Sequence, residues 1–163
     1  MTSLAAVEMT TSLIILHPSE LRLLCIYHPT FARWMFPGGR VQLAEAPHQT
    51  VLREIAEEVG LSVRLCDMSA LPVWDDGTNR RLAQPFAVIE ERAPGHNSLA
   101  AFVDFVFVGI ACHDRLTLNA EVLKAAWCDR CEIAALNTTY PIQALAEAVF
   151  DDTVRIREKV EAI

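Results

Sequence analysis

The order of apolar segments predicts a single α/β sandwich domain that spans residues 1–163. Two observations carry this prediction. Short segments rich in β-branched and aromatic residues, typical of strands, alternate with two longer segments typical of helices. No repeat, linker or low-complexity tract divides the chain, and 52% of its residues are apolar, which is enough for a full core.

The predicted strands are short apolar runs bounded by turn residues. They cover residues 11–16, 21–27, 61–65, 86–90, 102–110 and 123–128, with a further short strand at 40–43. His17-Pro18-Ser19-Glu20 separates the first two strands, and polar turns or loops are expected at 75–79 and 93–98.

Two helices are predicted, and each has a recognisable boundary. The first runs from Pro47 to Val59, because proline suits the first turn of a helix and Gly60 suits the position just after its end. The second covers residues 142–160 and is expected to break near Asp151 and Asp152.

The charge and the cysteines limit the classes of function. A net charge of −7 argues against a protein that binds a nucleic-acid duplex, since such a protein needs a basic surface. Five scattered cysteines do not form a disulfide framework, and reduced, mostly buried thiols in a cytoplasmic protein are expected. The Cys128-x-x-Cys131 pair lacks the second pair that a structural zinc site needs. No segment predicts a signal peptide or a membrane span.

The first predicted helix carries an acidic face. Glu54, Glu57 and Glu58 lie at positions i, i+3 and i+4, and Val51, Ile55 and Val59 are expected on the opposite, packed face. Carboxylates this close repel one another, and a hard divalent cation such as Mg²⁺ or Mn²⁺ would relieve the repulsion. By itself, however, a glutamate-rich face more often means an ordinary solvated helix.

The spacing around this helix favours the metal site. Gly39 is followed after five residues by Glu45, and after seven more by Arg53-Glu54-Ile55-Ala56-Glu57-Glu58-Val59-Gly60-Leu61. This segment resembles the complete Nudix box, Gly-x5-Glu-x7-Arg-Glu-U-x-Glu-Glu-x-Gly-U, where U is a bulky aliphatic residue. The resemblance implies the Nudix fold, an α/β/α sandwich with a central mixed β-sheet in which the box forms a loop, a helix and a second loop.

The resemblance also implies roles for individual residues. Glu57 and Glu58 would bind the metal, with Glu54 as a further ligand or as the base, and the carbonyl of Gly38 would also coordinate. Arg53 and Glu45 would support these carboxylates, and Gly39 and Gly60 would shape the two ends of the box. Outside the box, Glu121 precedes Trp127 as in many members and is a candidate ligand or base. The catalytic set expected from the resemblance is therefore Glu54, Arg53 and Glu121.

The expected activity is metal-dependent hydrolysis of a diphosphate bond in a nucleoside diphosphate linked to another group, by attack of water at phosphorus. The substrate stays open among nucleoside triphosphates, nucleotide sugars and dinucleotides, and a binding module without activity is the alternative class. Trp34 and Phe36, beside the glycine loop, are candidates for stacking on a base. Asp104 is a candidate substrate contact within an apolar strand, and a homodimer is left open.

Overall fold

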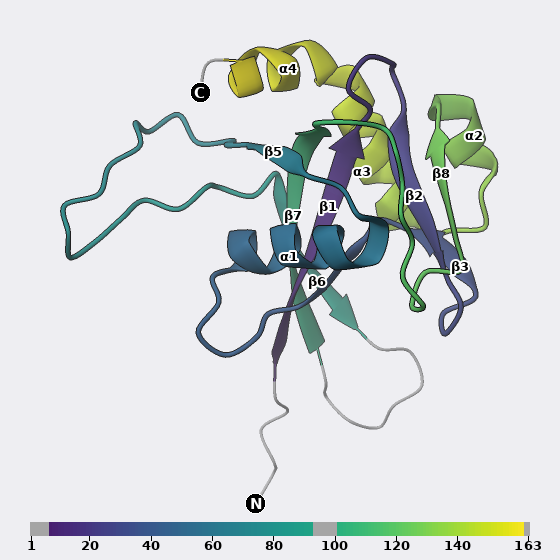
Figure 1. Cartoon of the computed structure of the whole chain (residues 1–163), viewed down its shortest axis with the longest axis horizontal. Helices are drawn as coiled ribbons and strands as arrows, with labels where there is room; N and C mark the ends of the chain where they lie inside the picture. Colours follow the sequence, from purple (N-terminus) through teal and green to yellow (C-terminus); the bar gives the residue numbers. More distant parts are fainter. Residues whose placement is uncertain (1–6, 93–100, 162–163) are drawn as a thin grey trace, which may run out of the picture.

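Two long parallel strands, β1 and β7, form the centre of the sheet (Figure 1). The computed structural model describes residues 7–92 and 101–161, so the loop expected at 93–98 lies outside the described residues. The strands are β1 (Glu8–Leu16), β2 (Leu23–His28), β3 (Arg33–Met35), β4 (Gly38–Arg40), β5 (Val63–Cys66), β6 (Ala87–Arg92), β7 (Ala101–Ala111) and β8 (Lys124–Cys128). The helices are α1 (Pro47–Val59), α2 (Arg130–Ala135), α3 (Tyr140–Asp151) and α4 (Thr153–Glu161).

The sheet is mixed, as the fold prediction requires. Strand order runs β3-β2-β1-β7-β5, with β4 also on β1, β6 also on β7 and β8 also on β2. Only the β1–β7 pair is parallel among the described pairings. Because β1 and β7 start at the same end of the sheet, β4 and β6 flank them there, and β2 and β5 flank them at the other end.

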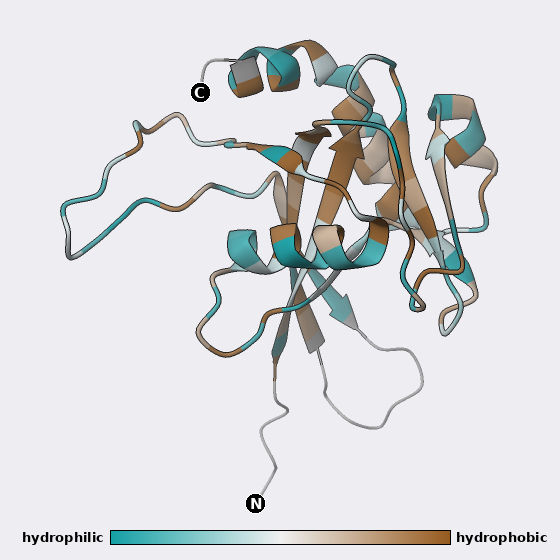
Figure 2. Ribbon diagram, viewed as in Figure 1, coloured by the Kyte–Doolittle hydropathy of each residue, from teal (hydrophilic) through white to brown (hydrophobic). Residues whose placement is uncertain are grey.

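The two faces of the sheet bury two separate cores, because successive strand residues point to opposite sides. Leu13 and Ile15 of β1 pack towards α1. Ile14 and Leu16 point the other way, into a core that α3 and α4 complete. Helices therefore cover both faces, and the hydropathy colouring shows apolar central strands behind α1, whose visible side is largely polar (Figure 2). The predicted α/β/α sandwich is confirmed.

The helix predictions are confirmed, and two short elements were not expected. Helix α1 has the predicted bounds, and Gly60 ends it with φ 69° in the left-handed region. The second predicted helix is divided into α3 and α4 at Asp152, where Thr153 Oγ1 donates to the carbonyls of Val149 and Phe150. Strand β3 and helix α2 are too short to leave a periodic signal. The strand expected at 40–43 was wrong, because the pairing with β1 begins at Gly38 and ends at Arg40.

The cysteines are all free, and three of the five are buried, in agreement with the expectation of mostly buried thiols. Within the described residues, no helix is both long and apolar enough to cross a membrane.

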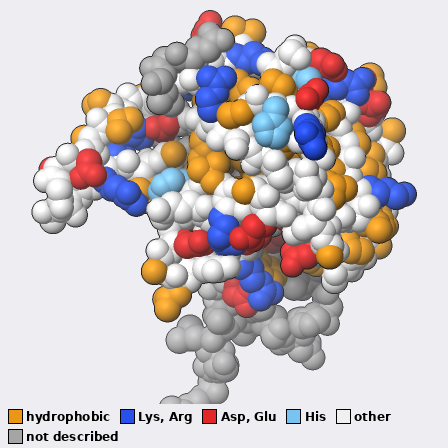
Figure 3. Space-filling view, in the orientation of Figure 1, with side chains coloured by type: hydrophobic (Ala, Val, Ile, Leu, Met, Phe, Trp, Pro, Cys, Tyr) orange, Lys and Arg blue, Asp and Glu red, His pale blue; other side chains and the backbone are white. Residues whose placement is uncertain are grey.

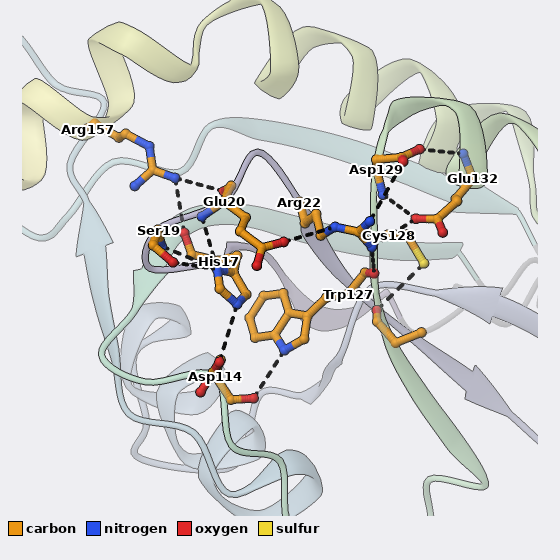
Figure 4. A network of polar contacts seen from close by, with 11 residues as sticks. His17, Ser19, Glu20, Arg22, Asp114, Trp127, Cys128, Asp129, Glu132 and Arg157 are labelled. Atoms are coloured by element: carbon orange, nitrogen blue, oxygen red, sulfur yellow. Dashed lines mark hydrogen bonds and ion pairs between the residues drawn. The ribbon is translucent and has the colours of Figure 1, made fainter.

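His17 contacts Ser19, Glu20 and Asp114 at the turn between β1 and β2, and these polar contacts are called the His17 clasp below (Figure 4). The backbone amides of Ser19 and Glu20 donate to His17 Nδ1 at 3.2 and 3.1 Å, and His17 Nε2 lies 3.6 Å from an Asp114 oxygen. The imidazole also meets the Trp127 ring edge-on, with 4.9 Å between centroids. Since the imidazole is buried and its Nδ1 accepts two amide hydrogens, the side chain fixes the turn that the sequence marked only as a break.

Replacement of this imidazole tests the clasp. We expect His17→Ala to lower the free energy of unfolding by about 2 to 3 kcal/mol, because two amides lose their acceptor and Trp127 loses a contact. Urea denaturation measures the change, and His113→Ala, at an exposed histidine, is the matched control. Equal stability of the two variants would contradict the role given to His17.

Candidate active site

One apolar face of α1 packs on the sheet and fixes where the carboxylates of this helix lie. Val51, Ile55 and Val59 are fully buried in the core on the α1 side of the sheet, as predicted. The side chains of α1 that point away from the sheet lie where Figure 3 shows acidic and basic groups side by side on the surface.

The three glutamates of this helix differ in exposure. The side chain of Glu57 is 57% exposed and that of Glu54 is 15% exposed, whereas Glu58 as a residue is only 4% exposed. The expectation that all three share an exposed face was therefore wrong for Glu58. Glu58 follows Ile55 by three residues and Val51 by seven, so it continues the stripe that packs on the sheet.

Burial makes Glu58 unusual. Desolvation raises the pKa of its carboxyl to about 7, and the charges of Glu54, Glu121 and Glu57 act in the same direction. The backbone amide of Gly38 donates to Glu58 Oε2 at 3.0 Å, which opposes the rise in pKa. The carboxyl is thus held against β4 in an environment that penalises its negative charge.

Arg53 connects the other carboxylates. Its Nε and Nη2 donate to the two oxygens of Glu45 at 2.8 and 3.0 Å, and its Nη1 donates to Glu54 at 2.8 Å and to Glu57 at 3.2 Å. The guanidinium lowers the pKa of Glu45, whose second oxygen also accepts from Thr50 Oγ1. Arg53 therefore orders three carboxylates, which agrees with the supporting role that the resemblance implies for it and for Glu45.

The two glycines of β4 lie where a side chain has no room. A Cβ on Gly38 would lie 2.0 Å from the carbonyl oxygen of Thr11, and a Cβ on Gly39 would lie 2.4 Å from Cδ of Glu54. Gly38 therefore allows β4 to lie against β1, and Gly39 allows the Glu54 carboxylate to lie against β4.

Glu121 reaches the same place from a loop after β7. The amides of Thr117 and Asn119 donate to the carbonyls of Val59 and Glu58, so the loop is tied to the end of α1. Asn119 Oδ1 in turn accepts from the Glu121 amide at 2.9 Å. The charge of Glu121 is near enough to raise the pKa of Glu58, so the structure brings this residue to the box glutamates.

The other candidate substrate residues have different surroundings. Phe36 is 2% exposed and belongs to the core on the α3 side, and its stacking on a substrate stays a prediction. Trp34 is half-buried, with its ring edge-on to Tyr27 at 5.8 Å. Asp104 is 4% exposed, and Thr10 Oγ1 donates to it at 2.9 Å. Burial raises the pKa of Asp104.

A hollow of about 600 Å³ lies on the face of the sheet that α3 covers, opposite the face that α1 covers. Its lining residues come from β6 and from the start of α3, and they are Ile89, Glu90, Glu91, Thr139 and Pro141. Ile89 pairs with Asp104 across β6 and β7, Asp104 pairs with Thr10, and Thr10 pairs with Arg40 of β4. One row of paired residues thus links the hollow to the glycine strand.

Thr50, Asn119 and the wall of the hollow were not identified from the sequence. Thr50 is fully buried and bonded to Glu45, yet a threonine inside a helix carries no signal of such a role. Asn119 bonds the Glu121 amide and Thr139 lines the hollow. Both positions depend on the paths of loops, which no spacing rule predicts.

The ligand set for a metal ion is not drawn together in the part of the chain that the structure describes, where no three acidic, histidine or cysteine side chains converge as a metal site. Glu54 and Glu57 are instead paired with Arg53. The donors nevertheless fit a hard divalent cation, since all are oxygens and the buried Glu58 lies near three other carboxylates.

Comparison with known proteins identifies the family. The family model described as the NUDIX domain matches residues 8–146. The chain therefore belongs to the Nudix family.

Individual relatives agree with this assignment. An 8-oxo-dGTP diphosphatase of Proteus vulgaris is 36% identical over 58 residues, a match that covers 36% of this chain and about half (51%) of the relative. A NUDIX-family hydrolase structure from Clostridium perfringens superposes with a TM-score of 0.70 at 20% identity, covering 90% of this chain and 97% of the other. The E. coli dihydroneopterin triphosphate pyrophosphohydrolase gives 0.68 at 18% identity, with 88% and 95% covered. These structures confirm the fold.

The two glycines of β4 give a paired prediction. We expect Gly38→Ala to lower the free energy of unfolding by about 3 kcal/mol or more, because the new methyl group meets backbone. Gly39→Ala should cost less than about 1 kcal/mol, because it meets the movable end of Glu54. Denaturant titration of both variants measures the difference, and a reversed order would show that the close contact at Gly38 is misplaced.

Glu58 makes stability depend on pH. Its folded-state pKa, about 7, lies above its ordinary value of 4.5, so the folded state favours the protonated form and loses stability as pH rises from 4.5 through 7. Without metal, we expect Glu58→Gln to match the unsubstituted protein below pH 4.5 and to be more stable by about 3 kcal/mol above pH 7. Unfolding measured across pH with a chelator present checks this, and parallel curves would contradict it.

Proposed function

We propose that the chain hydrolyses a diphosphate bond in a nucleoside diphosphate linked to another group and that it needs Mg²⁺ or Mn²⁺. The observation that carries this proposal is the buried Glu58 carboxyl beside Glu54, Glu57 and Glu121. An arrangement that only stabilised the fold would not bury one acid beside three others, because each like charge adds a cost. A divalent cation offsets that cost and supplies a reason for the arrangement.

Glu57 and Glu58 would hold the metal, with Glu54 and the Gly38 carbonyl as further ligands. When bound, a divalent ion neutralises phosphate charge and lowers the pKa of a coordinated water. Arg53 is a positioning residue in this proposal, because it contacts the carboxylates and is itself held by both oxygens of Glu45. Glu54 or Glu121 would accept the proton from the attacking water; within such a carboxylate cluster the proton is shared, which leaves both residues as candidates.

The substrate would be a small nucleotide. The relatives named above are a diphosphatase of 8-oxo-dGTP and a pyrophosphohydrolase of dihydroneopterin triphosphate, and each of these two compounds carries a heterocycle and a phosphate chain. In this chain the hollow of about 600 Å³, lined by the strand partner of Asp104, Ile89, is large enough to admit such a heterocycle. Trp34 lies towards that face, since Thr138 Oγ1 and the Asn137 carbonyl bond its backbone next to Thr139. Asp104 and Trp34 are therefore retained as proposed substrate contacts.

A substrate panel tests the activity. Nucleoside triphosphates, nucleotide sugars and dinucleotides are incubated with Mg²⁺ or Mn²⁺, and the products are identified by chromatography. We expect turnover of at least one class that stops when the metal is chelated, and Glu57→Gln should lower kcat by about 100-fold or more, because a metal ligand is lost.

The matched control is Glu158→Gln, at an exposed glutamate of α4, which should leave kcat unchanged. Full metal-dependent turnover by Glu57→Gln would show that its metal role is wrong. A nucleotide that raises the melting temperature without any turnover in the panel would favour a binding module instead. The cytoplasmic location and the homodimer stay predictions.

A further inference from the structure

Two cysteines lie on neighbouring strands in the core on the α3 side of the sheet. Cys25 of β2 pairs directly with Ala126 of β8, and Cys128 lies two residues further along β8. Residues two apart on a strand point to the same side, so the side chain of Cys128 is on the same face of the sheet as that of Cys25. Both residues belong to one buried cluster, and they are 0% and 4% exposed. The fold therefore places two thiols in one core.

The thiol of Cys128 is turned towards Cys25. Its Sγ donates to the carbonyl of Ala126 at 3.7 Å, which brings the sulfur alongside the strand partner of Cys25 (Figure 4). The two thiols also share a hydrogen bond, which lowers the pKa of Cys128 and raises the pKa of Cys25. Burial raises the pKa of Cys25 further. Cys128 is therefore the thiol that ionises, and Cys25 is the one that keeps its proton.

We propose that this pair is an oxidation site at which hydrogen peroxide forms a disulfide between Cys25 and Cys128. The Cys128 thiolate attacks one peroxide oxygen, the O–O bond breaks, and the sulfur becomes a sulfenic acid. The hydroxide that leaves takes up the proton that Cys128 released. Cys25 then attacks the Cys128 sulfur, the S–S bond forms, and the S–O bond breaks with loss of water. Two thiols thus lose two electrons and two protons, and one peroxide becomes two water molecules.

The surroundings favour this pair and a small oxidant. Cys66 is buried but directs its thiol to the sulfur of Met68 at 3.7 Å, and Cys112 and Cys131 are exposed. Cys128 is 4% exposed, so a molecule as small as peroxide suits it better than a bulky disulfide reagent. The new bond would tie β8 to β2 and close a loop of about 100 residues, the kind of loop in which a disulfide restrains the unfolded chain most.

A count of free thiols after oxidation tests the proposal. The protein is the full chain with both exposed cysteines replaced, Cys112→Ser and Cys131→Ser, which leaves three of the five thiols. It is treated with hydrogen peroxide, unfolded and labelled with N-ethylmaleimide. We expect the intact mass to show the loss of two of the three labels, and peptide mapping to show Cys25 joined to Cys128. Dithiothreitol should restore all three labels.

Two further variants in this background separate the pair from the other buried thiol. Cys66→Ala should leave the linkage intact. Cys25→Ala should abolish it and leave Cys128 with added oxygen, because the sulfenic acid has no second thiol to react with. Circular dichroism checks that both variants are folded. Peptide mapping of the unsubstituted chain repeats the test without any change to the core.

Three results would overturn the proposal. These are full labelling after oxidation, a free Cys25 beside an oxygenated Cys128, and a linkage of Cys128 to another cysteine in the unsubstituted chain. The proposed hydrolytic activity does not depend on any of them, so the two proposals stand or fall separately.

Discussion

The hydrogen bond from the Gly38 amide to the buried Glu58 carboxyl joins the glycine strand to α1, and the rest of the site depends on it. It places an acid on the packed side of the helix, where a hydrocarbon side chain would otherwise continue the Val51 and Ile55 stripe. A carboxyl in that position destabilises the metal-free fold at neutral pH, because burial penalises its charge. A carboxyl that lowers stability in this way is typical of a functional site, which agrees with the metal role proposed for Glu58.

Arg53 offsets the repulsion among the carboxylates at the more exposed side of the same helix. Without it, Glu45, Glu54 and Glu57 would repel one another and take many conformations. The guanidinium fixes Glu45 through two parallel hydrogen bonds and is thereby held in place for the other two acids. A lysine would supply the charge but not this planar geometry, so the residue type matters as much as the sign.

The sequence predicted the parts of the molecule that rest on local periodicity. The bounds of α1, its capping by Pro47 and Gly60, and the break between α3 and α4 all follow from patterns within a few residues. The site residues of the box were predicted from fixed spacing. The burial of two side chains could not be predicted, because exposure depends on what packs from outside the element. Glu58 is buried because β4 covers it, and Phe36 is buried because its side of the sheet is closed by α3 and α4, and neither contact is visible in local sequence.

The parallel pairing of β1 and β7 explains why distant segments serve one site. Because both strands start at the same end of the sheet, β4 and β6 lie on either side of them in one continuous row, from Arg40 through Thr10 and Asp104 to Ile89. Neighbouring strands are about 4.8 Å apart, so this row spans about 14 Å. The glycine strand beside the box glutamates lies at one end and the hollow at the other. A substrate that used both would need its hydrolysed bond and its recognised ring separated by a flexible link of similar length. A sugar between a phosphate chain and a base provides such a link, which agrees with the small nucleotide proposed as the substrate.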